Sequence, residues 1–114
     1  MGKVYVQHTG SAWNYSGSIV ATGSVNSGTF STKGYKHLVG GIYISGSLTS
    51  TSGLVIRQSF DGGSNWDYVT NYAPSTVGAS VYDITVYGDK MMITASPGAT
   101  DITAFRALFY LLPV

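Results

Sequence analysis

The side chains that could do chemistry are few and scattered along the chain. The acidic residues are all aspartates, and they stand one by one at Asp61, Asp67, Asp83, Asp89 and Asp101. The two histidines, His8 and His37, have no carboxylate or second histidine at a metal-ligand spacing. No run of aspartates forms the alternating ladder of a calcium loop, and no serine lies in a Gly-x-Ser-x-Gly elbow. We therefore predict a protein that is not an enzyme and that uses no metal and no other cofactor.

The most specific pattern is the segment Ser59-Phe60-Asp61-Gly62-Gly63-Ser64-Asn65-Trp66. It fits the Asp box, Ser-x-Asp-x-Gly-x-x-Trp, which is known from sialidases and many other β proteins. The Asp61 carboxylate can accept hydrogen bonds from turn amides, the two glycines can supply positive φ, and Trp66 can fold back over the hairpin. We predict a structural hairpin formed by Ser59, Asp61, Gly62, Gly63 and Trp66.

The Asp box does not bring sialidase activity with it. A sialidase-type propeller needs several blades of about four strands each, far more than 114 residues. Its active site also needs a cluster of arginines, and this chain has only Arg57 and Arg106. The acid of the box is expected to face its own turn.

Both arginines stand inside otherwise apolar strand segments. A buried guanidinium needs a carboxylate or several carbonyl groups. Either each arginine lies at an edge or on the surface, or it pairs with an aspartate such as Asp67 or Asp83.

The last strand, residues 102–112, is apolar on both faces. Thr103, Phe105, Ala107, Phe109 and Leu111 point one way, while the other face carries Ala104, Arg106, Leu108, Tyr110 and Leu112. Apolar side chains on both faces require cover on both sides. Either the strand lies between two packed layers, or another subunit covers its outer face. The candidate interface residues on it are Arg106, Leu108, Tyr110 and Leu112.

Length and composition place these elements in one domain. A chain of 114 residues has room for one core, and only 10% of it is charged while 44% is hydrophobic. A formal net charge of +1 with six Lys and Arg cannot build a basic stripe, so nucleic acid is excluded as a partner. The longest apolar run, residues 107–114, is too short for a bilayer, and residues 1–5 lack the apolar stretch of a signal peptide. We expect the protein to be synthesised in a cytoplasm and not to associate with a membrane.

Short runs of β-branched and aromatic residues are separated by Gly, Ser, Asn and Pro, and they predict about eight strands. The expected ranges are 3–8, 18–24, 35–48, 54–59, 66–72, 80–87, 90–95 and 102–112. The predicted fold is all-β, a single antiparallel β-sandwich or a jelly-roll-like barrel. Gly40-Gly41, in the middle of residues 35–48, suggests a bulge or bend, or a close approach of another backbone or side chain.

The N-terminal segment, residues 1–33, is the least regular part, and residues 34–114 form the predicted core of the sandwich. Serines, threonines and glycines of this segment surround Trp13 and Tyr15. These aromatics argue for an ordered segment, either an arm that packs on a neighbouring subunit or loosely paired strands of the same domain. Trp13 and Tyr15 are therefore candidate interface residues as well.

From Thr32-Lys33-Gly34-Tyr35-Lys36 onward, the order of elements resembles a group of small phage virion proteins. The shared order is a Gly-Tyr-Lys strand, the Gly-Leu-Val-Ile strand at 53–56, the turn at 58–63, the Asn-Trp-Asp strand at 65–67 and the Thr-Ala-Phe-Arg strand at 103–106. The N-terminal segment does not match.

The resemblance implies a β-sandwich of the virus particle, a capsid decoration (cement) protein or a tail-associated protein. It implies a homo-oligomer, a trimer by analogy, that binds the major capsid protein and resides in the virion after synthesis in the host cytoplasm. Nine tyrosines and Trp13 leave a second function open, a receptor- or glycan-binding module of a tail or fibre.

Overall fold

The computed structural model describes residues 12–20, 23–45, 53–72, 78–97 and 102–113. These parts of the chain form nine strands and no helix, which confirms the all-β class. The strands are β1 Trp13–Ile19, β2 Val25–Asn26, β3 Phe30–Ser31, β4 His37–Ile44, β5 Leu54–Ser59, β6 Tyr68–Tyr72, β7 Gly78–Thr85, β8 Lys90–Ala95 and β9 Ile102–Leu112.

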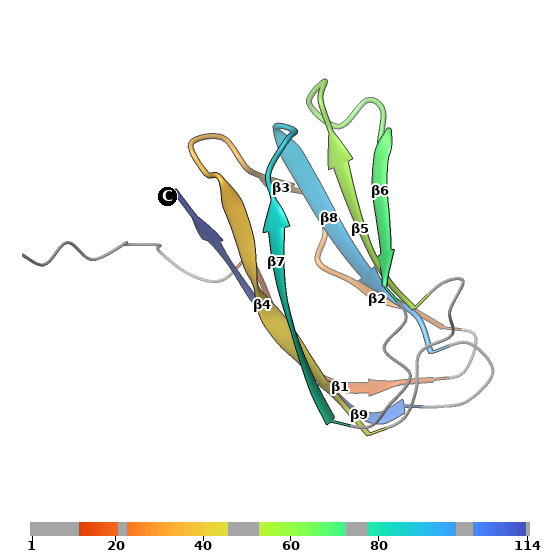
Figure 1. Ribbon diagram of the computed structural model, residues 1–114. Helices are drawn as coiled ribbons and strands as arrows, with labels where there is room; N and C mark the ends of the chain where they lie inside the picture. Colours follow the sequence, from red (N-terminus) through yellow and green to blue (C-terminus); the bar gives the residue numbers. More distant parts are fainter. Residues whose placement is uncertain (1–11, 21–22, 46–52, 73–77, 98–101, 114) are drawn as a thin grey trace, which may run out of the picture.

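The strands form two antiparallel sheets that face each other as a β-sandwich (Figure 1). One sheet, called here the four-stranded sheet, has the order β1-β9-β4-β7. The other, the five-stranded sheet, has the order β2-β8-β5-β6, and β3 also pairs with β8. The chain therefore crosses between the sheets several times, and strands distant in sequence become neighbours.

Three strands have the predicted bounds, namely β5, β8 and β9, and β4, β6 and β7 overlap their predicted ranges. The strand expected at residues 18–24 is wrong, because β1 runs over residues 13–19 instead. Trp13 and Ile19 are buried at its two ends. The serines and glycine between them have low strand propensity, which is why the strand was not predicted from the sequence. The strand expected at residues 3–8 lies outside the described residues.

The described part of the N-terminal segment belongs to the sandwich. β1 pairs with β9 at the border of the four-stranded sheet, while β2 and β3 pair with β8 in the other sheet. From residue 12 to residue 33, apart from residues 21–22, the segment is thus built into both layers and does not extend as a free arm.

Gly40 and Gly41 lie in the middle of β4, where neighbouring backbones come close. β4 keeps one continuous register with β7 and with β9, so the glycines form no bulge. A Cβ at Gly40 would meet the Leu108 carbonyl oxygen and lie 2.7 Å from the Phe109 Cα, and one at Gly41 would lie 2.7 Å from the Ser80 oxygen. Close approach, the second of the two predicted reasons for the glycines, is the one observed.

The core fills the space between the sheets. Alternate residues of β9 and β4 point inward from one sheet, and alternate residues of β5 and β8 meet them from the other. The fully buried large side chains include Leu38, Ile44, Leu54, Ile56, Met91, Ile93, Ile102, Phe105 and Phe109.

Candidate binding surface

The Asp-box segment forms the turn between β5 and β6. The buried Ser59 hydroxyl donates to the Asp61 carboxylate at 2.8 Å and accepts from the Gly63 amide at 2.9 Å. Gly62 and Gly63 have φ of 74° and 101°, a region open to glycine. A Cβ on Gly63 would lie 3.8 Å from the Trp66 ring, so the ring folds back onto the turn.

The Asp61 carboxylate is held by hydrogen bonds within its own turn. It accepts hydrogen bonds from the Asn65 side chain at 2.7 Å and from the Asn65 amide at 2.9 Å. These bonds, with the one from Ser59, lower the pKa of Asp61 to about 2. The carboxylate stays ionised and oriented towards the hairpin, which suits it for holding the turn and not for proton transfer.

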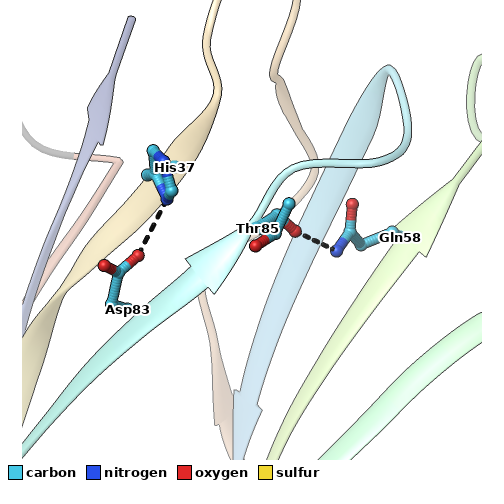
Figure 2. A network of polar contacts seen from close by, with 4 residues as sticks. All are labelled: His37, Gln58, Asp83 and Thr85. Atoms are coloured by element: carbon cyan, nitrogen blue, oxygen red, sulfur yellow. Dashed lines mark hydrogen bonds and ion pairs between the residues drawn. The ribbon is translucent and has the colours of Figure 1, made fainter. Parts of the chain in front are cut away.

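A second connection, which sequence analysis missed, joins this hairpin to the crossover between β7 and β8. Gln58, at the end of β5, is buried, and its amide donates to the Thr85 carbonyl at 2.9 Å (Figure 2). Its side-chain oxygen accepts from the amides of Tyr87 at 2.8 Å and Gly88 at 3.0 Å. Gln58 thereby holds the chain in place where it passes from one sheet to the other. The only sequence signal for this role is the position of a glutamine inside an otherwise apolar strand.

The outer face of the four-stranded sheet points away from the other sheet. Strand register places there Asn14 and Ser16 of β1, Arg106 and Leu108 of β9, Gly41 and Tyr43 of β4, and Ala79 and Val81 of β7. Leu108 is 40% exposed and Val81 is 85% exposed. The described residues form no third layer over this face, so β9 is an internal strand of its sheet with one face open.

A shallow hollow of about 410 Å³ lies on this outer face. It forms because the small residues Gly41 and Ala79 stand among the larger side chains Tyr43, Val81 and Leu108. Its lining is mainly apolar, and the polar residues Asn14, Ser16 and Arg106 lie on β1 and β9, on one side of the hollow. A hollow with this lining suits an apolar or aromatic group that carries a polar group at one end.

The two arginines lie on surface positions. The Arg106 guanidinium stands over the Tyr43 ring, 4.9 Å from its centroid, and the half-buried Arg57 donates to the Thr94 hydroxyl at 3.4 Å. The pairing with Asp67 or Asp83 is not found. His37 Nδ1 and an Asp83 carboxylate oxygen lie at hydrogen-bond distance, 3.0 Å apart, across β4 and β7 (Figure 2).

The structure separates the candidate interface residues into two groups. Arg106, Leu108, Tyr110 and Leu112 share the outer face, the first two exposed and the last two half-buried. Trp13 points the other way and is 6% exposed in the core, where its ring stacks on Phe109 with centroids 6.3 Å apart. Half-buried Tyr15 packs beside it. An exposed Trp13 face is therefore not present for a ligand.

The described residues hold no group of three His, Cys, Asp or Glu side chains that could bind a metal ion. His8 and Asp101 lie outside them. Within the same residues, no helix is long and apolar enough to cross a membrane. Comparisons with protein-family models, with curated proteins and with solved structures found no match to this chain.

Proposed function

We propose that this chain is a structural virion protein, a capsid decoration (cement) protein that binds the capsid surface as a homo-oligomer and stabilises it. The open outer face of the four-stranded sheet is the observation that carries the proposal. It combines exposed Leu108 and Val81 with a hollow between them. Contiguous apolar surface of this kind marks interaction sites on soluble proteins.

The sequence supplies the kind of partner. The order of elements from residue 32 onward resembles small phage virion proteins, and the decoration proteins among them bind the major capsid protein. The charged groups described on the outer face are few, Arg106 and Asp83, with His37 at hydrogen-bond distance from Asp83. Binding would draw on apolar burial, with little of the salt dependence of charge-steered association.

The test uses capsids of the virus whose genome encodes the chain, purified without the decoration protein. Co-sedimentation measures binding by the wild type and by Leu108→Asp, which places a charge beside the hollow. Val69→Asp is the matched control, because Val69 is 43% exposed, close to the 40% of Leu108, but lies on β6 of the other sheet. We expect Leu108→Asp to weaken binding on the order of tenfold or more and Val69→Asp to leave it unchanged.

Two results would contradict the proposal. A wild-type protein that is strictly monomeric and does not sediment with any capsid would remove it. Equal binding by Leu108→Asp and Val69→Asp would show that capsids contact another surface.

A second function is favoured by one detail of the hollow, the Tyr43 ring at its side with Arg106 above it. Aromatic rings stack on sugar rings, and guanidinium groups donate to hydroxyls. The chain would then be a receptor- or glycan-binding module of a tail or fibre. A glycan array tests this with the wild type and Tyr43→Ala; no bound glycan, or binding that Tyr43→Ala leaves unchanged, excludes this hollow as a sugar site. Trp13→Ala cannot serve, since Trp13 is in the core.

A further inference from the structure

The borders of the two sheets differ in how they are protected. A border strand exposes unpaired backbone groups that can pair with another chain, and proteins usually guard it with bulges, short length, charge or proline. β1 has a register shift between Gly17 and Ile19, β2 and β3 have two residues each, and β6 has five. These borders of the described sheets are short or irregular.

β7 is the exception. It has eight residues, Gly78–Thr85, and pairs with β4 along its whole length without a register shift. It contains no Lys, Arg or Pro, and its one charged side chain, Asp83, lies 3.0 Å from His37 of β4. Figure 1 shows it at the border of its sheet. Val81, in the middle of the strand, is 85% exposed. No described strand pairs with the other side of β7.

The backbone groups of β7 that face away from β4 can be assigned. Just beyond the strand, the Val86 amide donates to the Lys36 carbonyl at 2.9 Å, on the β4 side. Because amides alternate in direction along an antiparallel strand, those of Ile84, Tyr82 and Ser80 also face β4. The amides and carbonyls of Ala79, Val81 and Asp83 therefore face outward, ready for a further strand.

We propose that the outer edge of β7 pairs antiparallel with β7 of a second copy of this chain, around a two-fold axis at Val81. The two four-stranded sheets then become one continuous eight-stranded sheet. Ala79 and Val81 also line the hollow, so two hollows come to lie on either side of the axis on a single outer face. Pairing of this edge of β7 with a strand of another protein is an alternative that the test below distinguishes.

Side-chain size and charge select this register. With Val81 opposite Val81, Ser80 faces Tyr82 of the second copy and Gly78 faces Ile84, so each large side chain meets a small one. A two-fold register centred on Tyr82 would oppose two bulky rings that already pack against Tyr72. A register centred on Asp83 would oppose two carboxylates, which destabilises a strand pair.

This contact would be a subunit interface of the homo-oligomer proposed above, and it rests on that proposal for its role on the capsid. Its existence is tested without capsids. The chain has no cysteine, so Val81→Cys carries a single thiol. Residues that face each other as a hydrogen-bonded antiparallel pair have Cα atoms about 5.5 Å apart, which lies within the range of a disulfide.

The experiment follows disulfide formation at micromolar protein under mild oxidant on non-reducing gels. Val69→Cys on β6 is the control, a valine to cysteine change on an exposed border strand of the other sheet. We expect Val81→Cys to form a covalent dimer at least tenfold faster than Val69→Cys. Sedimentation equilibrium should show a wild-type dimer, and Val81→Lys, whose folding is checked by circular dichroism, should be monomeric.

Equal cross-linking rates, a monomeric wild type at about 100 μM, or a dimer that survives Val81→Lys would each overturn the inference. A wild type without self-association whose β7 pairs only with a capsid protein would overturn it too. A monomer that still binds capsids would refute this contact and the homo-oligomer, and would leave capsid binding by the outer face standing. A β7-linked dimer that ignores capsids would refute the proposed function and leave this contact standing.

Discussion

Replacing buried Gln58, which joins the Asp-box turn to the crossover between β7 and β8, should be one of the more damaging single changes in this protein. The side chain is 1% exposed, and it makes three hydrogen bonds with the backbone of residues 85, 87 and 88. Gln58→Leu keeps most of the volume and removes all three. At about 1 kcal/mol of net stability for each neutral hydrogen bond, the expected loss is about 3 kcal/mol.

Urea unfolding followed by circular dichroism measures this loss as a shift of the midpoint at an unchanged slope. In thermal unfolding, a loss of this size lowers Tm by roughly 10–15 °C for a domain of this length. Asn71→Leu, at an exposed position of β6, is the control and should change stability by less than about 0.5 kcal/mol. A loss below about 1 kcal/mol for Gln58→Leu would refute the argument, because water would then satisfy the crossover amides as well as glutamine does.

Other changes probe the turn, the sheet and the core. Asp61 has a folded-state pKa of about 2, below its ordinary value of 3.8, so its stabilising effect is present above pH 4 and is lost as the pH falls towards 2. The urea midpoint of the wild type should therefore drop more between pH 7 and pH 2.5 than that of Asp61→Asn, and parallel curves would contradict this. Gly40→Ala forces a Cβ against the backbone of β9 and should cost about 1–3 kcal/mol or more. Gly17→Ala, whose Cβ would lie 3.0 Å from the hydroxyl oxygen of the movable Tyr15 side chain, should cost less in the same urea assay. Trp13→Ala should cost about 3–5 kcal/mol in thermal or urea unfolding; a change near zero would mean that the ring does not fill the core.

Elements whose signals are local could be predicted from the sequence. β5, β8 and β9 have their predicted bounds because β-branched and aromatic residues alternate there between clear breaks. The Ser59–Trp66 turn follows from residue types at fixed spacing, since the hydrogen bonds of Ser59 and Asp61 within it join residues two to four positions apart. The two faces of β9 follow from the period of a strand, and the structure buries Phe105 and Phe109 while leaving Arg106 and Leu108 outside.

Features that depend on strand order and register could not be predicted. β1 is held by pairing with β9, about ninety residues further along the chain, and its serines and glycine give it little strand propensity of its own. Trp13 looked like a surface aromatic because the strand that turns it inward was not recognised. Gln58 acquires its role only when the chain returns at Thr85 to Gly88.

The sequence by itself determined that this is one all-β domain with a hydrogen-bonded Asp-box hairpin and a last strand that is apolar on both faces. These properties follow from the composition, from the residue spacing of the Asp box and from the two-residue period of a strand. Only the tertiary structure decided that β9 lies inside its sheet and that its outer face joins Tyr43 and Val81 around a hollow. It also decided that β7 is the longest border strand of the described sheets. The physical reason is that a surface shared by four strands depends on their order, and residues that meet there are separated by long stretches of chain.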